Sequence, residues 1–235
     1  MEYLSNYLVK TPVLIINYKT YEEARGRRGL DLSKIADKMA KEYDASIIVV
    51  PQLPDVINIA QQVEIPVYAQ HIDPNPSGSA TGHIDPYTLK EGSVAGTLLN
   101  HSERRLETSI LESSITLASK IGLETVVCAG TTGLSRALAS FGPTAVAMEP
   151  PELIGGDVSV TTRPEVVKQA VELIQNSNSN VLPLVGAGVK NDEHIKVAID
   201  LGSSGVLLAS GIVKHAHPEV VLENMAKILS RYNNS

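Results

Sequence analysis

The sequence predicts an α/β protein, a (β/α)8 barrel in which residues 1–235 form a single domain. Short apolar runs alternate with amphipathic segments from end to end, and neighbouring runs start about 27 residues apart, the length of one βα unit. Strict alternation favours a parallel sheet, and eight strands with right-handed crossovers can close into a barrel.

The eight apolar runs are β-rich and too short to be free-standing helices, so they are predicted as strands. They are Val13–Asn17, Ser46–Val50, Val67–Gln70, Ala95–Asn100, Thr125–Cys128, Thr144–Met148, Val181–Gly186 and Gly205–Ala209. A doubly wound open sheet is the alternative. Its dinucleotide-binding form has no support, because no Gly-x-Gly-x-x-Gly follows the first strand.

The segments between the runs have helical periodicity. They are Leu32–Tyr43, Val56–Gln62, Glu107–Gly122, Leu134–Phe141, Arg163–Gln175, Asp192–Leu201 and Glu219–Tyr232, with a weaker one at Asp85–Gly92. In the segment at 107–122, we expect Leu106, Ile110, Ile115 and Leu117 near one apolar stripe. Gly122 is expected at the C-terminal cap of this helix.

The composition limits the functions open to the chain. A formal net charge of −6 argues against a chain-wide attraction to nucleic acid. The single Cys128, expected as a small buried hydrophobe, excludes an intramolecular disulfide and fits a reducing compartment. No metal site is expected, because His215 and His217 lack a third ligand. Without a signal peptide or a run of ~18 apolar residues, we expect a cytoplasmic protein with no membrane partner.

Polar side chains follow several predicted strands where each strand ends. Lys19 lies after the first strand, His101 after the fourth and Glu149 after the sixth, and small residues follow the last two. A parallel barrel brings the carboxyl ends of all its strands to one rim. We therefore expect a lysine, a histidine and a glutamate to meet beside two loops suited to phosphate.

Five motifs resemble those of the triosephosphate isomerase family, whose fold is the TIM (β/α)8 barrel. They are Asn17-Tyr18-Lys19 (N-x-K), Asn100–Arg105 (NHSERR), Met148–Gly155 (the catalytic-base and lid motif), Val185–Val189 and Leu207–Gly211. N-x-K alone is a weak signal, whereas NHSERR together with EPPELIG is very specific. The motifs occur in family order at family spacing, and the short chain resembles the archaeal subfamily.

The resemblance implies a reaction and a set of catalytic residues. The family interconverts dihydroxyacetone phosphate and glyceraldehyde 3-phosphate through an enediol(ate), without a cofactor, and the roles below are established for it. Glu149 corresponds to the base, His101 to a neutral electrophile and Lys19 to the local positive charge. Asn17 would bind a substrate oxygen and help to position Lys19. Glu103 would anchor the site through Lys19, or act only as a structural ion-pair residue.

His101 is expected to keep a neutral ring for a local reason. Ser102 can cap a short helix that begins at Glu103, and the backbone N–H groups of that helix start would point at the ring. They favour a nitrogen lone pair there, so the other ring nitrogen can donate a hydrogen bond.

The resemblance also implies substrate-binding residues, a lid and an interface. The binding residues are Asn17, Lys19, Ile154, Gly155, Gly186, Gly188, Ala209 and Ser210. The lid lies near residues 150–160. The loop near residues 72–83, rich in Pro, Gly and Ser, corresponds to one that reaches a neighbouring subunit, with Thr81 as the contact in a homodimer or homotetramer. A flexible surface excursion is its other interpretation.

Two other functions are compatible with a phosphate-handling barrel. A sugar-phosphate lyase or a different isomerase would share the loops after the last two strands, but gives no reason for NHSERR. A non-catalytic phosphate binder predicts damage to the base or the electrophile, and both Glu149 and His101 are present.

Overall fold

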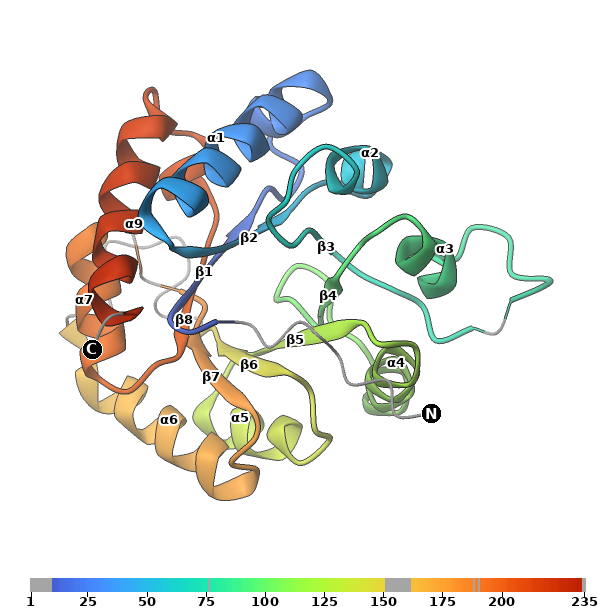
Figure 1. The fold of residues 1–235 in the computed structure, drawn as a ribbon. Coiled ribbons are helices and arrows are strands. Elements are labelled where there is room, and N and C mark those ends of the chain that lie inside the picture. The colour runs from blue at the N-terminus through green and yellow to red at the C-terminus, as the bar shows by residue number, and fades with distance from the viewer. Residues whose placement is uncertain (1–9, 76, 151–161, 188, 190, 234–235) are drawn as a thin grey trace.

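Eight parallel strands form the centre of the molecule, and helices surround them (Figure 1). The computed structural model describes residues 10–75, 77–150, 162–187, 189 and 191–233. The strands are β1 (Val13–Asn17), β2 (Ser46–Val50), β3 (Tyr68–Ala69), β4 (Gly96–Leu99), β5 (Glu124–Ala129), β6 (Ala145–Met148), β7 (Leu182–Val185) and β8 (Gly205–Leu208). The prediction of a single-domain TIM (β/α)8 barrel is confirmed.

The strands are hydrogen-bonded in the order β2-β1-β8-β7-β6-β5-β4-β3. The first and last strands of the chain are neighbours, with Val13 opposite Gly205. Gly205 has a φ of 151°, and a Cβ there would lie 2.2 Å from the Val13 carbonyl oxygen. The two outer strands of this order, β2 and β3, meet only through an isolated parallel bridge between Val49 and Val67. This β2–β3 seam is therefore one of two junctions that a single residue pair joins in the described part of the chain, the other being β7–β8 with Val185 opposite Val206.

The helices follow the strands as the periodicity predicted. They are α1 (Arg27–Tyr43), α2 (Val56–Ala60), α3 (Pro86–Glu91), α4 (Thr108–Ile121), α5 (Thr132–Ala139), α6 (Pro164–Ser177), α7 (Asp192–Asp200), α8 (Ser210–Val213) and α9 (Pro218–Asn233), with 3-10 turns η1 (Glu22–Ala24) and η2 (Leu53–Asp55). Helix α1 starts five residues before the predicted Leu32. Arg27 and Arg28 are exposed and Gly29 disfavours helix, so no helical signal marks this turn in the sequence, although Gly29 and Leu30 are buried. No helix in the described part of the chain is long and apolar enough to cross a membrane.

Two local predictions differ from the structure, one of them in part. Of the stripe predicted for α4, Ile115 is buried and Leu106 packs partly buried against the core, but Ile110 is exposed, and Leu111 and Ala118 are buried in addition. No helix begins at Glu103, where the chain makes a single turn closed by the Arg104 N–H to the His101 carbonyl, at 2.8 Å. The prediction for Gly122 is confirmed, since it caps α4 with a φ of 73°.

Alternate strand residues divide the core into two layers. One buried cluster combines strand residues such as Leu14 with helix residues such as Leu222, and so fills the space between sheet and helices. The other contains residues of the strands alone, among them Val13 and Ile15, and fills the barrel interior. Since the strands keep this period of two, the inward direction continues to Asn17 at the carboxyl end of β1.

The amino-terminal end of the barrel interior holds a buried polar pair. Tyr68 on β3 donates its hydroxyl hydrogen to Oε2 of Glu124 on β5. Gly96, between them on β4, leaves room for the tyrosine ring, because a Cβ there would lie 2.8 Å from Tyr68 Cζ. Burial raises the pKa of Glu124 to about 6, and it also raises the pKa of Tyr68.

We predict that Glu124→Gln removes a pH-dependent contribution to the free energy of unfolding. The folded-state pKa of about 6 exceeds the ordinary value of 4.5, so the folded protein holds this proton more tightly than the unfolded chain. The contribution is complete below pH 4.5 and is lost as the pH rises through about 6. As the pH rises from 4.5 to above 6, the free energy of unfolding of the wild type should fall by about 1 kcal/mol relative to that of the variant. This value allows for partial solvent screening.

Chemical denaturation across this pH range measures the difference. Glu172→Gln, at an exposed position of α6, is the matched control and should show no such trend. A difference between wild type and Glu124→Gln that stays constant with pH would contradict the prediction.

Candidate active site

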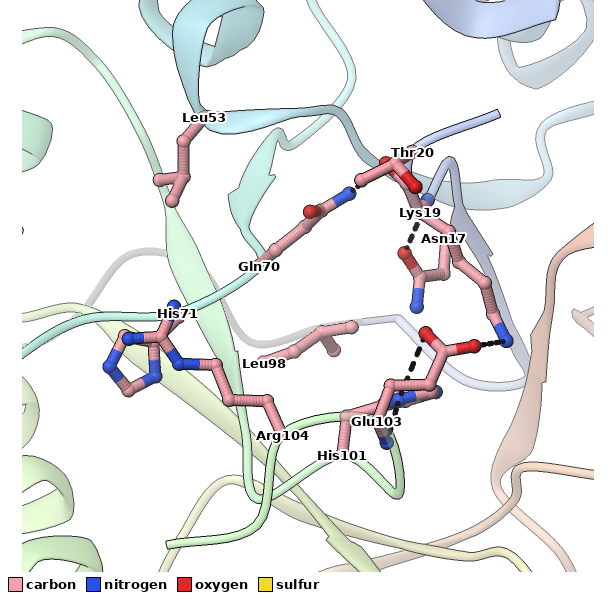
Figure 2. A pocket seen from close by; sticks show the side chains of 10 residues that line it. All are labelled: Asn17, Lys19, Thr20, Leu53, Gln70, His71, Leu98, His101, Glu103 and Arg104. Atoms are coloured by element: carbon pink, nitrogen blue, oxygen red, sulfur yellow. Dashed lines mark hydrogen bonds and ion pairs between the residues drawn. The ribbon is translucent and has the colours of Figure 1, made fainter. Parts of the chain in front are cut away.

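A cavity of about 180 Å³ lies at the carboxyl ends of the strands (Figure 2). Its lining comprises Asn17, Lys19, Thr20, Leu53, Gln70, His71, Leu98, His101, Glu103 and Arg104. Four of these, Asn17, Lys19, His101 and Glu103, are residues that the sequence predicted for the site. They come from β1 and from the turn after β4, which are separated in the chain by about eighty residues.

Lys19 is held in an unusual backbone conformation. Its φ is 46°, in the left-handed region, which costs a residue with a Cβ roughly 1–2 kcal/mol. The Lys19 N–H donates to Asn17 Oδ1 at 2.9 Å, and the ammonium donates to Glu103 Oε1 at 2.7 Å. Both ends of the residue are thus fixed, and Figure 2 shows the ammonium beside the Glu103 carboxylate.

The His101 ring is oriented from both sides. The Glu103 N–H donates to His101 Nδ1 at 3.2 Å, which assigns the lone pair to Nδ1 and the proton of the neutral ring to Nε2. Nε2 lies 3.3 Å from Glu149 Oε1. The predicted backbone N–H is therefore present, although it comes from a turn and not from a helix start.

Glu149 is a buried carboxylate with an unpaired oxygen. It follows β6, is 2% exposed, and donates its backbone N–H to the Ala129 carbonyl at 2.7 Å. Among the described residues, Oε2 has no hydrogen-bond partner. A buried carboxylate oxygen with a free lone pair is a strong candidate for a base.

Gly186, at the end of β7, makes the room that Glu149 occupies. A Cβ at this position would lie 2.6 Å from Glu149 Cγ and 3.2 Å from the Met148 carbonyl oxygen. The Gly186 N–H donates to that same carbonyl at 2.7 Å, so the backbone cannot move away without losing this bond. Only glycine fits beside this carboxylate.

Cys128 lies deeper in the barrel and is fully buried, in agreement with its prediction as a small hydrophobe. Burial, and then the neighbouring Glu149 carboxylate, raise the pKa of the Cys128 thiol well above its ordinary value. Cys128 is therefore held as a neutral thiol beside Glu149.

The residue before His101 is fixed by its own contacts. Asn100 has a φ of 58°, donates Nδ2–H to the Cys128 carbonyl at 3.0 Å, and accepts the Leu106 N–H at 3.0 Å. Arg105 donates Nη1–H to the Asn100 carbonyl at 2.8 Å. These side-chain contacts take the place of helical hydrogen bonds, which explains why no helix begins at Glu103.

The remaining predicted residues lie elsewhere or outside the described structure. Gly186, Ala209 and Ser210 lie at the ends of β7 and β8, and none of them lines the cavity. Ile154, Gly155 and Gly188, with most of the lid at 150–160, lie outside the described residues. The described residues contain no group of three or more His, Cys, Asp or Glu that could hold a metal.

Four polar lining residues are not among those predicted for the site: Thr20, Gln70, His71 and Arg104. Gln70 ends a predicted strand, so the rule that found Lys19 and Glu149 applied to it as well. His71 is 3% exposed, and its Nε2 lies 3.0 Å from Asp73 Oδ1. Burial lowers the pKa of His71, which favours the uncharged ring beside Arg104.

An eight-stranded parallel barrel whose strand ends bring together an ammonium, an imidazole and a buried carboxylate belongs to the class of α/β-barrel enzymes. A family model described as Triosephosphate isomerase matches residues 12–229. The chain belongs to the triosephosphate isomerase family.

Relatives with that name come from methanogenic archaea. The protein from Methanobacterium bryantii is 45% identical over 225 residues, which are 95% of this chain and 100% of the relative. The one from Methanocaldococcus jannaschii is 44% identical over 218 residues, which are 92% of this chain and 100% of the relative. The one from Methanosarcina acetivorans is 42% identical over 220 residues, 93% and 99% of the two chains.

We predict that His101 is a single tautomer with its proton on Nε2, because the Glu103 N–H occupies Nδ1. Side-chain ¹⁵N NMR near neutral pH distinguishes the two nitrogens. The exposed His217 is the control and should give a mixture of tautomers. A proton on His101 Nδ1, or on both nitrogens, would show that the turn does not set the ring.

Proposed function

We propose that this protein interconverts dihydroxyacetone phosphate and D-glyceraldehyde 3-phosphate by moving a proton between adjacent carbons. The observation that carries the proposal is the meeting of three groups at one end of the barrel. The Lys19 ammonium and the His101 ring line one cavity, and Glu149 Oε1 lies 3.3 Å from His101 Nε2.

Glu149 and His101 have complementary roles in this reaction. The Glu149 carboxylate takes a proton from the carbon next to the carbonyl, and the C–H electron pair forms the enediolate double bond. His101 donates a hydrogen bond from Nε2 to the carbonyl oxygen as that oxygen gains charge. Glu149 then returns its proton to the neighbouring carbon, and a proton exchange between the two oxygens completes the isomerisation. No net oxidation takes place and no cofactor is required.

Lys19 supplies the positive charge that an acidic chain needs for a phosphorylated substrate. The formal net charge is −6, so long-range attraction does not favour an anion. Lys19 stabilises both the phosphate and the developing negative oxygen, while Asn17 binds a substrate oxygen and holds the Lys19 backbone. Glu103 orients the ammonium without contacting substrate. We assign phosphate binding to backbone N–H groups at Ala209 and Ser210, with Ile154, Gly155 and Gly188 outside the described residues. The Gly186 N–H is already donated to the Met148 carbonyl, so Gly186 contributes the space beside Glu149 and not a phosphate hydrogen bond.

The proposal extends to assembly and location. The loop at 72–83 carries exposed residues at its tip, including Ser79 and Thr81, and is pinned at its base where Asp73 Oδ2 accepts the Ile84 N–H at 2.7 Å. A pinned base with an exposed tip suits a loop that contacts a second subunit, so we propose a homo-oligomer. We also propose a cytoplasmic location, because one free cysteine and a phosphorylated metabolite both fit that compartment.

We predict that Glu149→Gln abolishes turnover of glyceraldehyde 3-phosphate in a coupled assay. Removing the base should lower kcat by at least 10²–10⁴-fold, the usual contribution of a general base. The amide keeps the size of the side chain, so the thermal midpoint should change little. Glu91→Gln, at an exposed position of α3, is the control and should retain wild-type turnover. An active Glu149→Gln variant, or an inactive wild type, would refute the proposed function.

Assembly is tested by light scattering with Thr81→Arg. The new charge at the loop tip should lower the measured molar mass toward that of one chain, 25.1 kDa. Ser179→Arg, in the exposed connection after α6, should leave the mass of the wild-type oligomer unchanged. A wild type that is monomeric at micromolar concentration contradicts the assembly while leaving the reaction untouched.

A further inference from the structure

One of the two junctions of the barrel with a single residue pair lies beside Lys19. Strands β1 and β2 share a register of five residue pairs, from Val13 opposite Ser46 to Asn17 opposite Val50. Across the β2–β3 seam, a single bridge joins Val49 and Val67. Beyond that bridge, toward the carboxyl ends, the described residues show no further ladder pair between these two strands. At this level a side chain, and not a ladder pair, connects β3 to the loop that carries Lys19.

Gln70 makes this connection. Its Nε2 donates to the Lys19 carbonyl at 2.8 Å and lies 3.4 Å from the Val50 carbonyl. The Val50 carbonyl, at the end of β2, also accepts the Tyr18 N–H at 3.0 Å, so the second acceptor is itself bonded to the residue before Lys19. Figure 2 shows the Gln70 side chain extended from β3 toward Lys19, across the mouth of the cavity.

The conformation of Lys19 gives this contact its importance. With a φ of 46°, Lys19 occupies a region that a residue with a Cβ leaves unless its surroundings hold it there. Asn17 holds its N–H and Glu103 holds its ammonium. Gln70 donates to the Lys19 carbonyl, and this is the restraint that comes from β3, across the β2–β3 seam from Lys19. Without it, the Lys19 carbonyl loses this restraint, and the turn that the Tyr21 N–H closes to the Tyr18 carbonyl, at 3.2 Å, remains.

We propose that Gln70 is a positioning residue for the reaction: its amide fixes the Lys19 peptide across the β2–β3 seam and so places the ammonium. This inference rests on the proposed function and extends it to a residue that acts through Lys19. Gln70 lines the cavity, but its amide N–H groups point to backbone carbonyls and not to a reacting atom.

The expected effect follows from the role of Lys19. An ammonium that interacts with both the phosphate and the developing oxyanion affects binding and the chemical step when it moves. A misplacement of about 1 Å can cost on the order of 10²-fold in rate. Loss of Gln70 should therefore raise KM and lower kcat together, with kcat/KM reduced about 10- to 100-fold.

The test compares two matched glutamine substitutions in the full-length protein. Gln70→Met keeps the length of the side chain and removes its donor. Gln52→Met is the control, because Gln52 is also half-buried and donates Nε2–H to a backbone carbonyl, that of Tyr21, at 3.3 Å. Tyr21 lies two residues beyond Lys19, so both variants remove an anchor of the same loop, but only one removes the anchor of Lys19.

Three measurements are made on each variant: kcat and KM for glyceraldehyde 3-phosphate, inhibition by inorganic phosphate, and the thermal midpoint. The proposal expects Gln70→Met to lower kcat/KM as stated and to weaken phosphate inhibition roughly 5-fold, the effect of one hydrogen bond. Gln52→Met should leave both unchanged. If Gln70→Met does not fold, Gln70→Glu serves instead, because it keeps the shape of the side chain while its carboxylate repels the Lys19 carbonyl.

Normal kcat, KM and phosphate inhibition in a folded Gln70 variant would overturn the proposal. An equal loss of kcat/KM in Gln52→Met would also overturn it, because it would indicate a general effect on the loop. Failure of the proposed function is separate, since it appears as a wild type without turnover.

Discussion

Closure of the barrel is the constraint on which the site depends. In the hydrogen-bonding order, β1 and β4 are five strands apart, so in an open sheet their ends would be separated by about 24 Å. In the structure, the Lys19 ammonium after β1 lies 2.7 Å from the Glu103 carboxylate after β4. This ion pair is partly exposed and adds little to stability. Its importance is positional, because it joins the segment after β1 to the turn after β4 and so fixes Lys19 relative to His101.

The fold could be predicted from the sequence because each element repeats the same pattern. All eight strands lie within one or two residues of their predicted ends, since runs buried on both faces are bounded by residues that cannot continue them. The failures are places where tertiary contacts override periodicity. The turn at Glu103 takes its hydrogen bonds from the side chains of Asn100 and Arg105, which no periodic signal reveals. Helix α4 buries the predicted Ile115 but exposes Ile110 and buries Leu111, because its packing partners decide which residues are covered.

The candidate site was predicted unevenly for a similar reason. Lys19, His101 and Glu149 follow strands directly, so the rule of converging strand ends brings them together. Gln70 also ends a strand, yet its significance comes from the β2–β3 seam, and sequence does not show which junction of a barrel is weak. The burial of His71 depends in the same way on a neighbouring loop.

The site lies at the carboxyl end of the barrel interior, whereas the Tyr68–Glu124 pair lies at the amino-terminal end. In this pair, the residue at one position limits the residues that fit at its neighbours. The Tyr68 ring occupies the volume that a side chain at Gly96 would need, and its hydroxyl reaches the Glu124 carboxylate. Any larger residue at 96 requires a smaller one at 68 and a shift of the β5 backbone, because a Cβ there would also lie 2.7 Å from the Glu124 carbonyl oxygen. The acid at 124 then loses its donor. These three positions should consequently vary together during evolution, as one inherited unit, independently of the residues that serve the reaction at the opposite mouth.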